Sequence, residues 1–269
     1  MIAEVAKRTI ETRMEEEVLH LTLSRAEVKN AISLEMVHDL SEVFEGVLKD
    51  NQLNARAIVM RGAGGNFCAG ADVKEMNSLI ERCQRGDLAA IASHSAAAGK
   101  LFSLVERCPL PVVAVLEGTI LGGGLGMACA ADITIGKADA VFGLPETRLG
   151  LVPAQIAPFV RKRIGDSKAR LLAIVGGRFN AWQAAQFGIL DYVAADDGEL
   201  NTTIEEVLGK IKVCAPNAVA CAKRLMLGQA PSYDPYDLGM LFAQHMASDE
   251  GKEGTRAFIE KRKASWNKC

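Results

Sequence analysis

The stretch that decides the fold runs from Glu117 to Pro153 and reads EGTILGGGLGMACAADITIGKADAVFGLPETRLGLVP. An apolar strand is expected just before it, over 112–116, and a helix of small residues after the glycine run, over 125–131. Glycine permits backbone angles and close approaches that a side chain would forbid. A glycine turn that opens a helix also leaves backbone N–H groups free, and these can hold a negatively charged oxygen. The stretch therefore predicts a strand-to-helix turn with a binding role.

Glu146 follows the glycine run in the segment Phe-Gly-Leu-Pro-Glu. A carboxyl group among apolar residues can have a raised pKa, which suits it to proton transfer. Two nucleotide-binding motifs are excluded: the dinucleotide fingerprint needs glycine where Met127 stands, and no GxxxxGK[ST] segment occurs. On the residues alone, simple helix packing at the glycines and a solvated Glu146 remain open alternatives.

Composition restricts the class of protein. The chain has 269 residues, which suits one large domain or a core with a smaller appendage. Its net charge of −2 gives no electrostatic case for nucleic-acid binding. Basic clusters at 161–163 and 261–263 indicate either solvated helix faces or contacts with the phosphates of a small ligand.

The seven cysteines are odd in number and form no CxxC pair or zinc-ligand spacing with histidine. We therefore expect reduced thiols, no metal site and a cytoplasmic location. The N-terminus lacks the apolar core of a signal peptide, and no apolar run of about 18 residues is evident, so we expect no contact with membranes.

Strands and helices are expected to alternate along the first two thirds of the chain. Strands are predicted at 18–23, 57–60, 112–116, 133–135, 140–142 and 189–193. Helices are predicted at 33–48, from 73 onward, at 79–107 with a loosening near Gly86, at 161–175 and at 181–187. This alternation predicts an α/β fold with a largely parallel, buried sheet in residues 1–198. Residues 199–269 are expected to be helical, broken around 228–235, and to serve as a lid or a subunit contact.

A set of motifs occurs in a fixed order. They read NFCAGAD at 66–72, GTILGGG at 118–124, FGLPE at 142–146, LGLVP at 149–153, GR at 177–178, EGKEG at 250–254 and AFIEKRK at 257–263. Their order and spacing resemble the crotonase, or enoyl-CoA hydratase/isomerase, superfamily from about residue 18 to 266. The resemblance implies a spiral of ββα units with a C-terminal helical region, and homotrimers or dimers of trimers. It also implies an acyl-CoA thioester substrate, with no cofactor beyond the coenzyme A that the substrate carries.

The resemblance also implies roles for individual residues. The backbone N–H groups of Ala71 and Gly123 would polarise the thioester carbonyl, and Glu146 would transfer the proton. Enolate charge builds on that carbonyl oxygen, and each preformed donor stabilises it by about 3 kcal/mol. Contacts with coenzyme A are carried over by position to Arg25, Ala69, Val73, Phe258 and Lys261. For Phe258, packing of its own helix is an equal alternative.

The chain departs from the pattern of typical hydratases, which place two glutamates around one water. The first should follow the glycine run as GGGxE, but Gly126 stands there. Three functions stay open: a hydratase in which another group or the substrate positions the water, a Δ3,Δ2-enoyl-CoA isomerase with Glu146 as its single base, and a protein that does not hydrate. The last would be another enzyme of the crotonase type or a non-catalytic binding protein for acyl-CoA or RNA. Dehalogenases share GGGLG, but they need an aspartate nucleophile and a histidine, and His94 matches no such motif.

The segment after Pro153 favours one kind of hydratase. It reads AQIA where the usual hydratase has a glycine-rich PGxGG sequence. This segment and KVCAPN at 212–217 resemble hydratases of branched, carboxylated enoyl-CoAs of the 3-methylglutaconyl and isohexenylglutaconyl types. We therefore expect hydration of such a 2-enoyl-CoA, with Arg148 or Gln155 engaging the acyl carboxylate. A surface ion pair is the alternative for Arg148.

Overall fold

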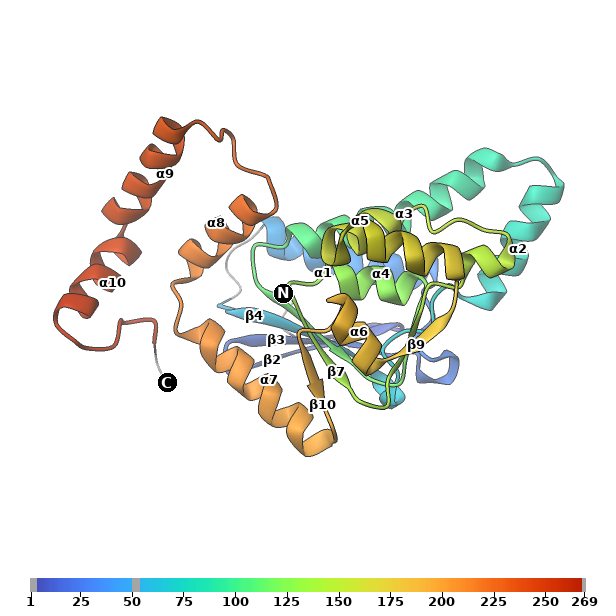
Figure 1. Cartoon of the computed structure of the whole chain (residues 1–269), viewed down its shortest axis with the longest axis horizontal. Helices are drawn as coiled ribbons and strands as arrows, with labels where there is room; N and C mark the ends of the chain where they lie inside the picture. Colours follow the sequence, from blue (N-terminus) through green and yellow to red (C-terminus); the bar gives the residue numbers. More distant parts are fainter. Residues whose placement is uncertain (1–3, 50–53, 268–269) are drawn as a thin grey trace.

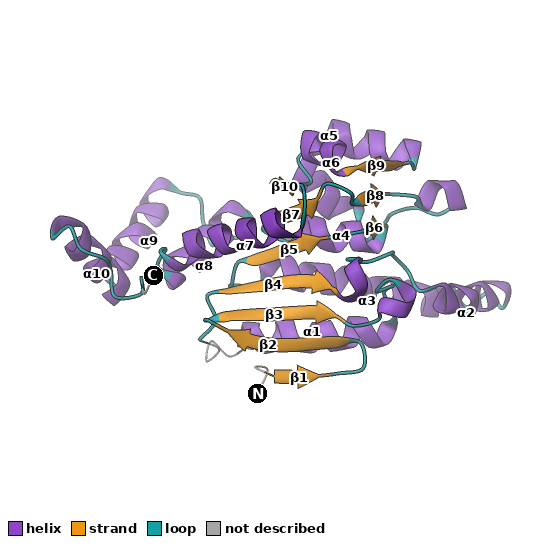
Figure 2. Ribbon diagram, turned by 90° about the horizontal axis from the view of Figure 1, so that it is seen from below, coloured by secondary structure: helices purple, strands orange, loops and turns teal. Residues whose placement is uncertain are grey.

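The computed structural model describes residues 4–49 and 54–267 (Figure 1). Its main sheet has seven strands in the order β1-β2-β3-β4-β5-β7-β10 (Figure 2). Each neighbouring pair from β3 to β10 is parallel, whereas β1, β2 and β3 pair antiparallel. The bounds are β1 Glu4–Ala6, β2 Ile10–Glu15, β3 Val18–Leu23, β4 Ala57–Gly62, β5 Val112–Leu116, β7 Ile133–Lys137 and β10 Tyr192–Ala194.

Both faces of the sheet are buried at the parallel strands β4 and β5, which are apolar at successive positions, whereas the antiparallel strand β2 alternates buried and exposed residues. Val59, Val113 and Ile135 face α7 (Asp197–Lys212), whose Leu200 and Ile204 complete one core cluster. The alternate strand residues join the larger core cluster with α1 (Leu34–Lys49), α3 (Leu88–Arg107) and α4 (Gly123–Ala130). The parallel part of the sheet therefore lies between helices on both faces, as the strand–helix alternation predicts.

A second, three-stranded sheet pairs β6 with β8 in parallel and β8 with β9 antiparallel. Its strands are β6 Thr119–Leu121, β8 Val141–Gly143 and β9 Arg178–Asn180. The further helices are η1 Ala26–Val28, η2 Ala63–Gly65, α2 Val73–Gln84, η3 Glu146–Leu149, α5 Ala157–Val175, α6 Ala181–Phe187, α8 Pro216–Met226, α9 Pro235–Ala247 and α10 Asp249–Ile259.

Most predicted elements are confirmed, and the helical stretch predicted over 79–107, with a loosening near Gly86, is fully interrupted at that point. It divides into α2 and α3, because Gly86 has a φ of 74° and Asp87 caps the new helix by accepting a hydrogen bond from the N–H of Ala90. The helix predicted to start at Arg161 begins earlier, at Ala157. Strands β1, β2, β6 and β9 were not predicted, and part of the turn predicted at 50–55 lies outside the described residues.

Helices α8, α9 and α10 form a C-terminal arm, residues 216–259, that extends away from the sheet (Figure 1). Helix α7 differs from the arm, since Leu200 and Leu208 are buried against the sheet. The predicted boundary between 198 and 199 falls inside α7, so the part that projects begins only after it. The division of the chain into two domains stays a prediction.

Helix α3 is long and apolar enough to cross a membrane, by length and composition alone. Core helices pass the same test, and α3 places Leu101, Phe102 and Val105 in the main core. This is weak evidence for a membrane span, and the expectation of no membrane contact stays a prediction.

Candidate active site

The glycine turn places a free N–H at the start of α4. Gly122 turns the chain from β6 into the helix. It has a φ of 50° and a ψ of −118°, a backbone conformation that residues with a side chain rarely adopt. Gly123 is the first helical residue, so its N–H lacks an intrahelical acceptor. A Cβ added to Gly124 would lie 2.5 Å from the carbonyl oxygen of Cys68, so the turn packs directly on the neighbouring loop.

That neighbouring loop presents a second free N–H, from Ala71. The N–H of Cys68 donates to the Thr119 carbonyl at 2.9 Å, so the loop runs beside β6. Ala71 forms an isolated parallel bridge with Ile32, in which Ile32 bonds to the residues on either side of Ala71. The N–H of Ala71 therefore faces away from Ile32. Burial raises the pKa of the Cys68 thiol to about 12, which makes it a structural residue rather than a nucleophile.

Ala71, Gly123 and Glu146 line one cavity of about 220 Å³. Within the described part of the chain, neither the Ala71 N–H nor the Gly123 N–H has a hydrogen-bond partner. The rest of the wall is mostly apolar and comes from α1, α2, α3 and the segment before α5. Two unpaired donors in such a cavity suit an oxygen that becomes negative during reaction.

Glu146 is the acidic residue among those described as lining this cavity. Its Oε2 atom is buried and has no hydrogen-bond partner within the described residues. A Cβ added to Gly122 would lie 2.8 Å from its Oε1, so the carboxyl group lies directly against the glycine turn. Burial raises the pKa of Glu146 above its ordinary value. Such a carboxyl group can both take and return a proton.

Gly126 faces an apolar wall. A Cβ added there would lie 3.0 Å from Cγ2 of Ile156 and 3.3 Å from Cε2 of Phe102. These two side chains fill the space into which a side chain at 126 would point. Among the described residues, Glu146 is therefore the one carboxyl group that lines the cavity, and a second could enter from 126 only if Ile156 and Phe102 moved.

Three residues predicted to contact coenzyme A do not line the cavity but lie in or next to the loop that carries Ala71. Arg25 donates to the Asp72 carboxylate and to the Ala31 carbonyl, each at 2.6 Å. Burial alone would raise the pKa of Asp72, but the hydrogen bond from Arg25 holds it below its usual range. Ala69 donates its N–H to the Lys29 carbonyl, and Val73 is exposed at the start of α2. Their roles toward coenzyme A stay predictions.

The other predicted substrate-binding residues are widely separated. Gln155 lines the cavity. Arg148 does not: its Nε lies 3.4 Å from the Val175 carbonyl oxygen, at the end of α5, and no ion pair is found for it among the described residues. Phe258, on α10, is 84% exposed, and Lys261 follows that helix. Helix α10 and the cavity-lining helix α2 lie at opposite ends of the molecule (Figure 1).

Sequence reasoning missed three polar residues of the cavity wall: Ser33, His94 and Ser95. The Nε2 atom of His94 lies 3.5 Å from Oε2 of Glu75, whose carboxylate accepts the N–H of Leu34 at the start of α1. The helical spacing of 94, 95, 98 and 102 on α3 was the available signal, because residues three or four apart share one face.

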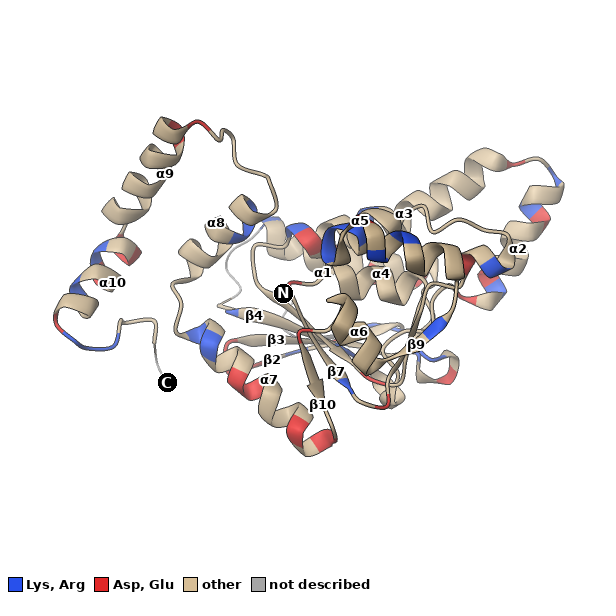
Figure 3. Ribbon diagram, viewed as in Figure 1, with Lys and Arg blue, Asp and Glu red and all other residues tan. Residues whose placement is uncertain are grey.

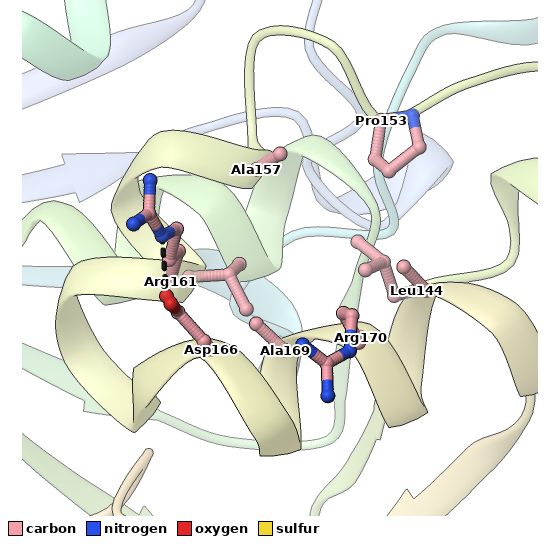
Figure 4. A pocket seen from close by; sticks show the side chains of 9 residues that line it. Leu144, Pro153, Ala157, Arg161, Asp166, Ala169 and Arg170 are labelled. Carbon is pink, nitrogen blue, oxygen red and sulfur yellow. Dashed lines mark hydrogen bonds and ion pairs between the residues drawn. The ribbon is translucent and has the colours of Figure 1, made fainter.

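The basic cluster at 161–163 is engaged within the chain, as part of the basic residues along α5 (Figure 3). Arg161 pairs with Asp166, Lys162 with Glu106 at 2.8 Å and Arg163 with Asp191 at 2.5 Å. Figure 4 shows the first pair at the rim of a separate cavity of about 320 Å³ beside α5. These pairings favour the structural interpretation of the cluster over a phosphate site.

One group of residues in the described chain could hold a metal ion, namely His38, Asp39 and Glu42 on α1. Lys7 already pairs with Glu42, and its Nζ lies 3.3 Å from Oδ1 of Asp39. None of these residues lines the cavity. The group therefore has no evident part in the chemistry there.

Comparison with known proteins shows which family this chain resembles. The model of the enoyl-CoA hydratase/isomerase family matches residues 13–268. The probable mitochondrial enoyl-CoA hydratase 2 of Arabidopsis thaliana is 31% identical over 253 residues, which cover 91% of this chain and 80% of that protein. The mevalonyl-coenzyme A hydratase SIDH of Beauveria bassiana is 31% identical over 257 residues, which cover 93% of this chain and 91% of that protein.

Solved structures of other proteins have the same fold as this chain. AtuE of Pseudomonas aeruginosa is 41% identical with a TM-score of 0.91, and the match covers 97% of this chain and 100% of that one. An enoyl-CoA hydratase/isomerase from Marinobacter aquaeolei is 37% identical with a TM-score of 0.89, at the same coverage. The predicted crotonase fold is therefore confirmed. The chain belongs to the enoyl-CoA hydratase/isomerase family, whose enzymes act on acyl-CoA thioesters.

Proposed function

We propose that this enzyme adds water to a 2-enoyl-CoA thioester with Glu146 as its one catalytic carboxyl group. The observation that carries the proposal is the buried, unpartnered Oε2 of Glu146 in the same cavity as the free N–H groups of Ala71 and Gly123. Hydratases among the relatives support the same reaction. No separate cofactor is needed, because proton transfer and an oxyanion hole supply the chemistry.

The proposed reaction uses each of the three groups once. The N–H groups of Ala71 and Gly123 donate to the thioester oxygen and stabilise the enolate that forms when water attacks the β-carbon. Glu146 takes a proton from that water and returns one to the α-carbon. The raised pKa of Glu146 suits this exchange, since the same group must act first as base and then as acid.

A second candidate function is Δ3,Δ2-enoyl-CoA isomerisation. Gly126, packed against Ile156 and Phe102, leaves Glu146 as the one carboxyl group among the residues described in the cavity wall. Moving a double bond needs one base to carry one proton between two carbons, and it needs no bound water. The lack of a second carboxyl group favours this alternative.

For the acyl group we propose a branched, carboxylated chain of the 3-methylglutaconyl or isohexenylglutaconyl type. Relatives named as mevalonyl-coenzyme A hydratases support a branched substrate. The position of Arg148 argues against its contact with the acyl carboxylate, because its guanidinium group lies beside the end of α5. Ser33, His94 and Ser95 line the cavity and are better placed to meet a polar acyl group.

For the assembly we propose a homotrimer or a dimer of trimers. The C-terminal arm exposes apolar side chains, of which Phe242 is 71% and Ile259 73% exposed. Burying such a surface against other copies would be favourable. In an assembly of this kind, Phe258 and Lys261 could reach the coenzyme A of a neighbouring subunit, since α10 projects away from the sheet (Figure 1).

Mass spectrometry of products tests the reaction and the acyl group together. The panel holds crotonyl-CoA, a 3-enoyl-CoA, 3-methylglutaconyl-CoA and isohexenylglutaconyl-CoA. Gain of one water on the carboxylated substrates supports the proposal. An unchanged mass with a shifted double bond on the 3-enoyl substrate supports the isomerase instead. A panel left wholly unchanged would contradict both, and thermal shifts with coenzyme A and with RNA would then identify a binding protein.

A further inference from the structure

Two consecutive residues of the cavity wall pack on glycines of two different helices. A Cβ added to Gly99, in α3, would lie 2.0 Å from Oε1 of Gln155. A Cβ added to Gly126, in α4, would lie 3.0 Å from Ile156. Glycine inside a helix costs about 1 kcal/mol relative to alanine. Gly99 and Gly126 therefore make room for the side chains of Gln155 and Ile156.

The side chains of Gln155 and Ile156 differ in burial and polarity. Ile156 is buried and fills the space beside Gly126 with hydrocarbon. Gln155 is half-buried, lines the cavity, and makes no hydrogen bond with any other described residue. An amide that lies in a cavity without a protein partner is free to bind water or substrate. Its position is set by Gly99, since any larger residue there would displace it.

We infer that Gln155 positions the water that Glu146 activates, and so supplies the polar contact that Gly126 cannot. This inference rests on the proposed hydration. The Gln155 carboxamide accepts one hydrogen of the water, and Glu146 accepts the other. An amide does not ionise, so it orients the water without taking its proton.

The electrons and atoms of the step balance without a further reactant. A lone pair of the water oxygen forms the bond to the β-carbon. The π electrons of the carbon–carbon double bond form a new double bond between the α-carbon and the carbonyl carbon, and the carbonyl π electrons move onto the thioester oxygen. The proton lost by the water goes to Glu146. The enolate then collapses and takes that proton at the α-carbon, which leaves a hydroxyl group on the β-carbon and Glu146 ionised again.

The test separates water positioning from acyl binding. The hydration substrate is the member of the panel that the wild-type enzyme hydrates fastest. Its saturated counterpart serves for α-proton exchange in D2O, followed by NMR, which needs Glu146 and the oxyanion hole but no attacking water. Q155L should lower hydration by about 10²-fold, as expected for a misplaced reactant. Exchange should stay within about twofold.

A second variant tests whether the position of the Gln155 amide matters for hydration. In G99A the amide remains but is pushed from its place, so hydration should fall while exchange persists. The matched control is G209A, since Gly209 lies in α7 and an added Cβ would meet nothing within 4 Å. Its rates for both reactions should equal those of the wild type. Melting temperatures of all three variants check that the fold is intact.

Equal losses of hydration and exchange in Q155L would overturn the inference, because Gln155 would then bind the acyl group or hold the cavity together. Unchanged hydration in Q155L would overturn it as well. Failure of the proposed hydration itself is visible earlier, in a wild-type enzyme that hydrates no member of the panel. That result would overturn both proposals, whereas the variant results concern Gln155 alone.

Discussion

The two ends of the cavity are built differently. At the chemical end, Gly122 and Gly123 form a buried backbone turn, and Glu146 packs against it. Elsewhere the wall consists of side chains such as Leu79 and His94 on α2 and α3, and we call this part the acyl end because we propose that the acyl chain lies there. A substitution at the chemical end disturbs backbone angles and displaces the N–H donors or the Glu146 carboxyl group. A substitution at the acyl end changes only the shape and polarity of the wall. The reaction should therefore be sensitive to the first end and the choice of substrate to the second.

The largest effect is expected at Glu146. E146Q keeps the size of the side chain but removes the group that exchanges a proton, so turnover should fall by about 10²–10⁴-fold. Binding of the acyl-CoA should change little, because the N–H groups of Ala71 and Gly123 remain. Steady-state kinetics and calorimetric titration measure the two quantities. Turnover close to that of the wild type would show that another group carries the proton.

A smaller but still large loss is expected from G122A. The φ of 50° is unfavourable for alanine, and the new Cβ would lie 2.8 Å from Oε1 of Glu146. The free energy of unfolding should fall by about 1–3 kcal/mol, and kcat by about 10²-fold as Glu146 and the Gly123 N–H shift. Denaturant unfolding and kinetics test this. If stability fell without loss of kcat, the turn would not set the geometry of the site.

At the acyl end the effect should depend on the substrate. L79W narrows the wall where α2 meets the cavity, so kcat/KM for a long, branched acyl-CoA should fall by about 10-fold or more. Crotonyl-CoA, or the shortest substrate accepted, should be affected by less than about twofold, since its acyl chain ends sooner. Equal losses for both substrates would place Leu79 at the chemical end and contradict the contrast between the two ends.

The smallest expected effect is the dependence of stability on pH. Burial raises the pKa of Glu146 above its ordinary value of 4.5, so the folded state holds its proton more tightly than the unfolded state does. The stabilisation by that proton is complete below pH 4.5 and is lost as the pH rises through the raised folded-state pKa. E146Q cannot ionise, so its melting temperature relative to wild type should rise by about 2 °C between pH 4 and 8. A constant difference would contradict the raised pKa.

The pH dependence of activity has the opposite sign. As a base, Glu146 acts only when ionised, so kcat/KM should increase with pH through the same raised pKa.

The cavity residues that sequence reasoning identified lie in short motifs. Ala71, Gly123 and Glu146 each follow a recognisable segment, and all three line one cavity. The missed residues have no such segment: His94 lies on an alanine-rich helix face, and its partner Glu75 is nineteen positions away. The break between α2 and α3 was predicted only as a loosening near Gly86, because apolar periodicity continues across that residue while the helical backbone does not.

By itself, the sequence determined the α/β class, the glycine turn and the identity of the single carboxyl group, because each depends on local propensity or on a contiguous motif. Only the tertiary structure decided that Arg148 lies beside α5, that Phe102 and Ile156 close the space at Gly126, and that Gly99 makes room for Gln155. These contacts join residues about 20–60 positions apart in the chain. Their geometry depends on how the helices pack, and close packing cannot be read from the order of residues.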